Sequence, residues 1–99
     1  MNLKQLKNLI NKKTKAIIPV HLYGQPCNMS EIVKISKKFN IDIIEDCAQA
    51  QGAKFKNKYV GTFGRFGCFS FYPTKILGSY GDGGFILTNS YNDYKKIKR

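Results

Sequence analysis

Cysteines, acidic side chains and long apolar runs are all scarce in this sequence. The three cysteines, Cys27, Cys47 and Cys68, form no C-x-x-C pair, and an odd number cannot pair fully within the chain. This usage favours a reduced, cytoplasmic setting. No apolar run approaches the roughly 20 residues that span a bilayer, and the amino-terminal residues lack the apolar core of a signal peptide. We therefore expect a soluble chain with no membrane partner.

The shortage of acidic residues leaves the chain strongly basic. Seventeen Lys and Arg residues stand against six Asp and Glu, which gives a formal net charge of +11. Such an excess is typical of proteins that bind nucleic acids when the cations cluster. Here the lysines are scattered in ones and twos over the polar faces of the expected helices. We predict no nucleic-acid partner, and a small basic nucleic-acid-binding protein is kept as an alternative.

The first half of the chain alternates helix and strand patterns. Apolar residues recur at helical spacing over 3–10, and the apolar run 16–20 is typical of a strand in a parallel sheet. Asn28 and Glu31 have the spacing of a capping box that begins a second helix, and a strand is expected at 41–45. Short connections between such elements predict an α/β domain with a mostly parallel sheet and flanking helices.

The second half of the chain is richer in strand signals. A small hairpin is expected around Asn57–Lys58, strands are expected at 67–72 and 83–89, and a helix begins near residue 91. There is no internal repeat and no linker. The expected sheet lacks the layers that would cover both of its faces, so we interpret residues 1–99 as one piece of a larger domain.

Two charged residues stand where a cofactor site is expected. Asp46 follows the strand 41–45, and Lys75 follows the strand that ends near Tyr72. Ligands of open α/β sheets bind beyond the carboxyl ends of the strands, so parallel strands would place both side chains at one edge. A lysine and a carboxylate in one pocket suit pyridoxal phosphate chemistry. The alternative is an ordinary surface acid and one of fifteen ordinary lysines.

Four longer motifs carry a family resemblance over about residues 15–89. They are "AIIPVHLYGQPCNM", "IIEDCAQAQGA", "GTFGRFGCFSFYPTKILG" and "YGDGGFILTN". Taken in this order and at this spacing, the sequence resembles the DegT/DnrJ/StrS family of pyridoxal-phosphate-dependent nucleotide-sugar aminotransferases. The resemblance implies part of the large domain of the aspartate-aminotransferase-like fold, which is fold type I of the pyridoxal phosphate enzymes.

The resemblance also implies roles for four residues. Lys75 would form the internal aldimine with pyridoxal 5'-phosphate and later move a proton, and Asp46 would pair with the pyridinium nitrogen. Gln49 would lie against the ring, and the Ser70 hydroxyl would bind the cofactor phosphate. No metal is implied. Two interpretations of His21 remain: a structural histidine that forms a hydrogen bond at a strand end, or a residue with a role near the cofactor.

The implied reaction moves an amino group, with L-glutamate as the expected donor, to a nucleotide-linked keto-deoxy sugar for polysaccharide, glycan or antibiotic-sugar biosynthesis. One branch of the family replaces the lysine by histidine and performs dehydration, so Lys75 argues against that branch. The resemblance implies a homodimer. Family members are several times longer than this chain. We therefore expect an amino-terminal segment and a small carboxyl-terminal domain outside residues 1–99. The alternative is a non-catalytic truncated remnant or binding module of the same fold.

Overall fold

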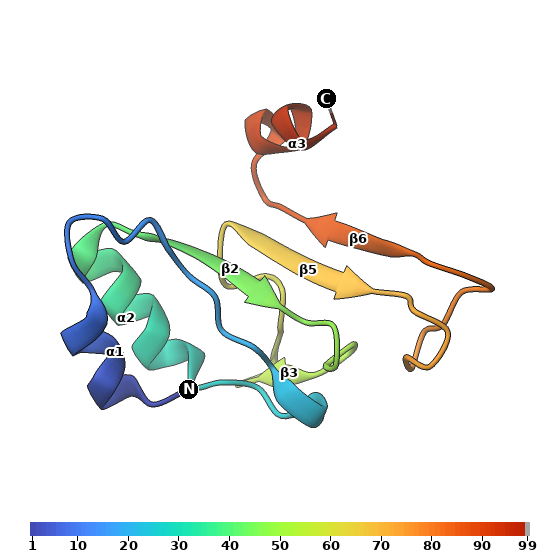
Figure 1. Cartoon of the computed structure of the whole chain (residues 1–99), viewed down its shortest axis with the longest axis horizontal. Coiled ribbons are helices and arrows are strands. Elements are labelled where there is room, and N and C mark those ends of the chain that lie inside the picture. The colour runs from blue at the N-terminus through green and yellow to red at the C-terminus, as the bar shows by residue number, and fades with distance from the viewer. Residues whose placement is uncertain (99) are drawn as a thin grey trace.

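A computed structural model describes residues 1–98 and shows helices at both ends of a mixed sheet (Figure 1). The elements in chain order are α1 (Leu3–Leu9), β1 (Ala16–Ile17), a 3-10 turn (Leu22–Gly24), α2 (Met29–Phe39), β2 (Asp42–Asp46), β3 (Lys54–Phe55), β4 (Lys58–Tyr59), β5 (Phe66–Ser70), β6 (Gly84–Leu87) and α3 (Tyr91–Ile97). Helices α1 and α2 lie side by side at one end of the sheet, and α3 stands apart from them. In the part of the chain that the structure describes, no helix has the length and apolar content needed to cross a membrane.

The main sheet has the strand order β1-β2-β5-β6. Strand β1 pairs with β2 and β2 pairs with β5 in parallel, whereas β6 pairs with β5 in the antiparallel sense. The expectation of a mostly parallel sheet is therefore confirmed. Because β2 and β5 are parallel, their carboxyl ends lie at the same edge, with Asp46 opposite Cys68.

The predicted strand 16–20 is only partly regular. Its ladder with β2 ends at Ile17, since Pro19 has no N–H to donate. The chain stays close to β2 through two other bonds. The Asp46 amide donates to the Pro19 carbonyl at 2.9 Å, and the His21 amide donates to the Asp46 carbonyl at 3.0 Å. These bonds fix the carboxyl end of β2.

Several predicted boundaries differ from the structure by one or two residues. Strand β2 ends at Asp46 rather than before it, and β5 ends at Ser70 rather than at Tyr72. The turn of the β3–β4 hairpin is formed by Lys56 and Asn57, both at positive φ (48° and 63°), so the predicted turn was one residue late. Two residues at positive φ make the tight turn that suits the twist of a hairpin.

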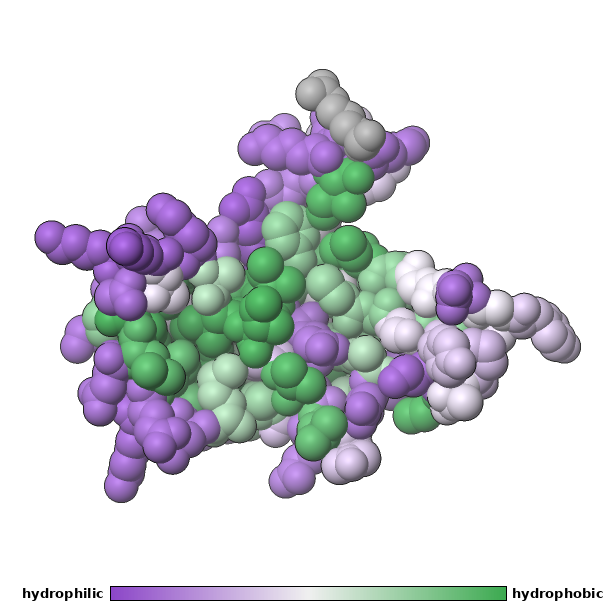
Figure 2. Space-filling model, viewed as in Figure 1, coloured by the Kyte–Doolittle hydropathy of each residue, from purple (hydrophilic) through white to green (hydrophobic). Residues whose placement is uncertain are grey.

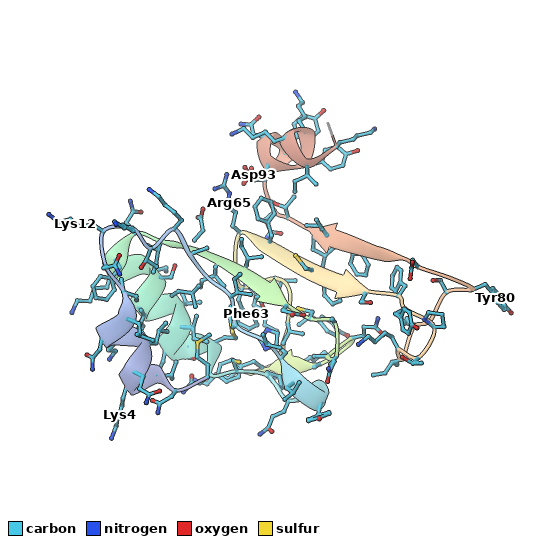
Figure 3. The ribbon with its side chains drawn as sticks, viewed as in Figure 1. Lys4, Lys12, Phe63, Arg65, Tyr80 and Asp93 are labelled. Atoms are coloured by element: carbon cyan, nitrogen blue, oxygen red, sulfur yellow. The ribbon has the colours of Figure 1, made fainter. Side chains whose placement is uncertain are left out.

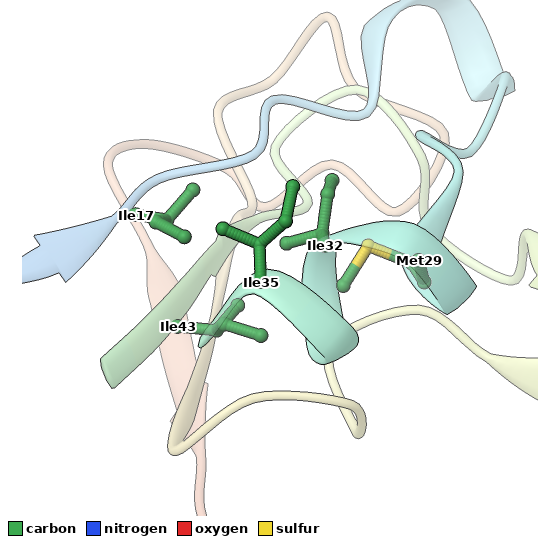
Figure 4. Packing of buried hydrophobic residues seen from close by; sticks show 5 residues of the cluster. All are labelled: Ile17, Met29, Ile32, Ile35 and Ile43. Carbon is green, nitrogen blue, oxygen red and sulfur yellow. The ribbon is translucent and has the colours of Figure 1, made fainter. Parts of the chain in front are cut away.

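Helix α2 packs against β1 and β2, and the larger of the two buried clusters lies between them. It begins at the Asn28 cap, whose side chain accepts the Glu31 amide proton, and it ends at Asn40 in the left-handed conformation. The Glu31 carboxylate turns to Lys34 instead of closing the predicted capping box. Figure 4 shows the buried cluster between the helix and the strands, made of Ile17, Met29, Ile32, Ile35 and Ile43.

Helix α3 is attached to the sheet by a buried acidic residue. The guanidinium of Arg65 makes two hydrogen bonds to Asp93, of 2.7 and 2.6 Å, and a third of 2.7 Å to Asp42 (Figure 3). The bonds from Arg65 lower the pKa of Asp93. This two-pronged geometry suits arginine rather than lysine, so it fixes the direction of the helix as well as its position.

One face of the molecule exposes a large amount of apolar surface. Figure 2 shows hydrophobic side chains running across its centre and toward α3. All four residues of β6 are exposed, and α3 adds exposed aromatic and aliphatic side chains. The larger contributors from this region are Phe85, Ile86, Leu87, Tyr91, Tyr94 and Ile97. A surface of this kind is typical of a site that contacts another protein segment, a ligand or a membrane.

Gly67 on β5 is expected to tolerate no larger residue. A Cβ there would collide with the backbone of Gly61, which crosses over the strand at positive φ (+85°). Gly67→Ala is expected to lower the free energy of unfolding by about 1–3 kcal/mol, because backbone atoms cannot move aside. Gly81→Ala is the matched control, since nothing lies within 4 Å of its Cβ position. Chemical denaturation of both variants checks this, and equal stability would show that the crossing relaxes easily.

Candidate active site

A pocket of about 400 Å³ opens beyond the carboxyl ends of β2 and β5. It unites two of the four predicted site residues, Gln49 and Lys75. Gln49 comes from the turn after β2, and Lys75 comes from the loop after β5. The remaining lining residues are Tyr23, Gly24, Ala48, Gln51, Thr74 and Ile76. The parallel pairing of two strands thus brings together side chains that are far apart in the sequence.

The loop that carries Lys75 is held in tight turns. The Lys75 amide donates to the Tyr72 carbonyl at 2.8 Å, which closes a turn around Pro73. Gly78 then passes against the same proline, where a Cβ would lie 2.5 Å from the Pro73 carbonyl oxygen. Only glycine allows this approach. The glycine that follows the lysine is therefore part of what shapes the loop.

Asp46 and Ser70 end the two strands that frame the pocket, but neither belongs to its lining in the described part of the chain. One oxygen of Asp46 accepts the Ala48 amide proton at 3.0 Å, which starts the turn that leads to Gln49. The Ser70 hydroxyl oxygen accepts the Tyr72 amide proton at 3.2 Å. Both side chains are half-buried, and their cofactor roles stay predictions.

Gln51 is a site residue that the sequence did not reveal. Its side-chain amide donates to the Ser70 carbonyl at 2.5 Å and accepts the Leu77 amide proton at 2.6 Å. The two partners lie 19 and 26 residues further along the chain, on either side of Lys75. Nothing local in "CAQAQGA" distinguishes it from Gln49, so no sequence signal was available.

Glu45, next to Asp46, is a fully buried carboxylate at the centre of a hydrogen-bond network. Its two oxygens accept from the amides of Gly61, Phe63 and Gly64, at 2.7, 2.7 and 2.8 Å, and from His21. Burial alone raises the pKa of Glu45, but the bonds from His21 and the three amides outweigh it, and the pKa is lowered. Backbone amides of the segment "GTFG" therefore surround an anion, and that anion is a side chain of the protein.

His21 is a structural residue of the same network. Its Nδ1 accepts the Cys27 amide proton at 3.0 Å, so Nε2 carries the proton that points to Glu45 at 3.2 Å. Of the two interpretations left open, the structural one is supported.

His21, Glu45 and Cys47 also place three metal-ligating atoms within 4.8 Å of one another. The nitrogens of His21 and the oxygens of Glu45 are already engaged in hydrogen bonds within the protein. Burial, followed by the nearby carboxylates, raises the pKa of Cys47 to about 12 and keeps its thiol protonated, whereas metals bind thiolates. We assign the cluster to hydrogen bonding.

Comparison with known proteins decides the family. The model of the DegT/DnrJ/EryC1/StrS aminotransferase family matches residues 1–99. The chain belongs to this family. The resemblance seen in the four sequence motifs is thereby confirmed. The chain spans about a quarter of the length of the curated relatives that it matches.

Several of the relatives that the chain matches carry the names of nucleotide-sugar enzymes. The chain is 46% identical over 98 residues to a protein named UDP-N-acetyl-3-dehydro-alpha-D-glucosamine 3-aminotransferase from Acidithiobacillus ferrooxidans. That match covers 99% of this chain and 27% of the relative.

Solved structures confirm the fold class. An aminotransferase from Psychrobacter cryohalolentis superposes with a TM-score of 0.95 at 39% identity, covering 99% of this chain and 25% of that one. A GDP-4-keto-6-deoxymannose-3-dehydratase with a trapped PLP-glutamate geminal diamine superposes at 0.90 and 36% identity, with coverages of 99% and 25%. The architecture is thus part of the large domain expected for this type of enzyme.

Proposed function

We propose that this chain is the cofactor-binding part of an aminotransferase that moves an amino group, from L-glutamate, to the keto group of a nucleotide-linked keto-deoxy sugar. The observation that carries the proposal is the pocket in which Gln49 and Lys75 meet beyond two parallel strands. Support for the substrate class comes from the 3-aminotransferase relative, and support for the donor comes from the glutamate adduct in the dehydratase structure.

The cofactor is pyridoxal 5'-phosphate, and the residues present fit it. Ser70 uses its hydroxyl oxygen as an acceptor, which leaves its proton to donate to a phosphate. One Asp46 oxygen binds the Ala48 amide, which leaves the other for a ring N–H. Gln49 is exposed on the pocket wall, where it can lie against the ring, and the half-buried Lys75 supplies the amine.

Bound pyridoxal phosphate supplies an aldehyde carbon and a ring that accepts electrons. The residues of this chain then have separate tasks. Lys75 would bind the cofactor covalently and, when released, would carry a proton as a general base and acid. Asp46 keeps a proton on the ring nitrogen because a carboxylate stabilises the nearby positive charge.

Amino transfer is favoured over dehydration, the reaction named for one of the structural neighbours. The lysine at position 75 supports this choice, because the dehydrating branch is expected to carry histidine there. We place the reaction in the cytoplasm, in the biosynthesis of surface polysaccharides or other glycans. The three free cysteines support a reducing setting.

The complete enzyme is proposed to be a homodimer with further segments on both sides of residues 1–99. The apolar surface of β6 and α3 supports this, since it needs a covering layer. The second candidate is a non-catalytic remnant or binding module of the same fold.

A half-reaction separates the two candidates. The protein as its natural gene encodes it is incubated with pyridoxal phosphate and L-glutamate, and 2-oxoglutarate is measured. An aminotransferase is expected to release about one equivalent per site without a sugar and to turn over when a nucleotide keto sugar is added. D-glutamate serves as the control donor. No 2-oxoglutarate above the D-glutamate control would reject amino transfer and support the non-catalytic candidate.

A further inference from the structure

In the described part of the chain, one side chain connects the loop that carries Lys75 to the rest of the site by a hydrogen bond. Within residues 1–98, the hydrogen bonds of the segment 71–83 stay between Ser70 and Gly84, apart from the one that Gln51 accepts from Leu77. The same glutamine donates to the Ser70 carbonyl, where β5 ends. Its side-chain amide therefore forms hydrogen bonds to the backbone both before and after the lysine, at Ser70 and Leu77.

The base of Gln51 is itself well anchored. The turns that follow β2 are fixed by bonds from the Ala50 amide to the Cys47 carbonyl and from the Ala53 amide to the Ala50 carbonyl, at 3.0 and 3.1 Å. Cys47 and Ala50 are fully buried. A rigid base with two short hydrogen bonds at its end gives a fixed distance between β2 and the backbone on either side of Lys75, at Ser70 and Leu77.

The position of Gln51 points to a role in the site. It lines the same pocket as Lys75, and its partner Leu77 is 60% exposed. An amide group is suited to this place because it donates from nitrogen and accepts at oxygen, and the two partners require one of each. A carboxylate or an apolar side chain of equal length meets one or neither requirement.

We propose that Gln51 is the positioning residue that holds the Lys75 amine at the place where it reacts with the cofactor aldehyde. The proposal rests on the proposed function, since it assigns the same lysine the same task. Gln51 touches neither reacting atom and acts by fixing the backbone on either side of Lys75, at Ser70 and Leu77. Its loss is expected to change how fast Lys75 reacts without unfolding the sheet.

The test compares Gln51→Leu and Gln51→Glu with the wild type and with Gln5→Leu, a change of the same kind on the exposed surface of α1. Gln51→Leu removes both bonds, and Gln51→Glu keeps the acceptor for Leu77 while losing the donor to Ser70. Two quantities are measured in the protein as naturally encoded. One is hydrogen exchange at the Leu77 amide without cofactor. The other is the rate at which pyridoxal phosphate is attached to Lys75, trapped with borohydride and located by peptide mass spectrometry.

Gln51→Leu is expected to speed Leu77 exchange and to slow Lys75 trapping, each by about tenfold or more, as the loss of a hydrogen bond predicts. Gln51→Glu is expected to leave Leu77 exchange near the wild-type rate and to slow trapping by a smaller factor. If Gln51→Leu misfolds, the slower trapping expected in Gln51→Glu still tests the proposal. Gln5→Leu is expected to change neither quantity.

Two results would overturn the positioning role while leaving the proposed function intact. In the first, Leu77 exchange rises but Lys75 is trapped at the wild-type rate, so the contact is merely structural. In the second, Leu77 exchange does not change in Gln51→Leu, so the contact does not hold the loop. If wild-type protein shows no preferential trapping at Lys75, the proposed function itself fails and this inference fails with it.

Discussion

Glu45→Ala is expected to lower the free energy of unfolding by about 3–5 kcal/mol, the largest stability effect of any single change considered for this chain. The substitution leaves His21 Nε2 and the amides of Gly61, Phe63 and Gly64 without their acceptor inside the fold. Each buried donor left unpaired costs about 1–3 kcal/mol, and water entering the vacated space recovers part of the sum. Urea unfolding of the naturally encoded protein measures the change.

Glu31→Ala is the matched control, because that carboxylate is partly exposed and, within residues 1–98, forms its ion pair with Lys34. It is expected to leave the unfolding midpoint close to that of the wild type. Similar midpoints for Glu45→Ala and Glu31→Ala would show that the Glu45 network does not hold the loop 61–64 in place.

The same carboxylate predicts a pH dependence. Its pKa is lowered in the folded protein, so its contribution to stability is present above the unfolded value of about 4.3 and is lost as the pH falls through the folded value. Glu45→Gln has no such ionisation. The stability difference between wild type and Glu45→Gln is therefore expected to shrink below about pH 4, and a difference that is constant from pH 7 to pH 3 would contradict this account.

Lys75→Ala is expected to abolish amino transfer, with a fall in turnover of at least about 100-fold. The reason is that no other group in the pocket of described residues is an amine that can bind the cofactor aldehyde or carry the proton. The visible absorbance of the lysine–cofactor bond is expected to disappear at the same time. Steady-state kinetics and absorbance spectra of the full protein measure the two effects.

Two further variants separate chemistry from charge. Lys75→Arg keeps a positive side chain but has no nucleophilic amine, so it is expected to be as inactive as Lys75→Ala. Lys13→Ala removes an exposed lysine outside the pocket and is expected to behave like the wild type. Turnover in Lys75→Ala at the Lys13→Ala rate would remove Lys75 from the mechanism.

The parts of the fold that depend on local pattern were predictable from the sequence. The Asn28 cap of α2, the α/β alternation and the parallel pairing of the strands that lead to Asp46 and Lys75 were expected and are observed. The predicted boundaries were wrong at strand ends. Pro19 interrupts the ladder of β1, and β5 ends at Ser70, two residues before the predicted end. Such boundaries depend on pairing partners that a single strand does not specify.

The long-range polar contacts were the features that the sequence hid. Glu45 carried a readable signal, since it alternates with the buried Ile43 on β2 and a buried carboxylate requires donors. Its donors, three amides 16–19 residues further along the chain and His21 24 residues before it, could not be named. Gln51 carried no signal at all, because its two bonds exist only once β2 and β5 are neighbours.

The most direct test of the central claim is to find which lysine binds the cofactor. The naturally encoded protein is mixed with one equivalent of pyridoxal phosphate, reduced with borohydride, digested and mapped by mass spectrometry. The structure and the family predict a single predominant modification at Lys75, in the peptide that contains "YPTK". A label spread over the fifteen lysines, or concentrated on any lysine other than Lys75, would contradict the account.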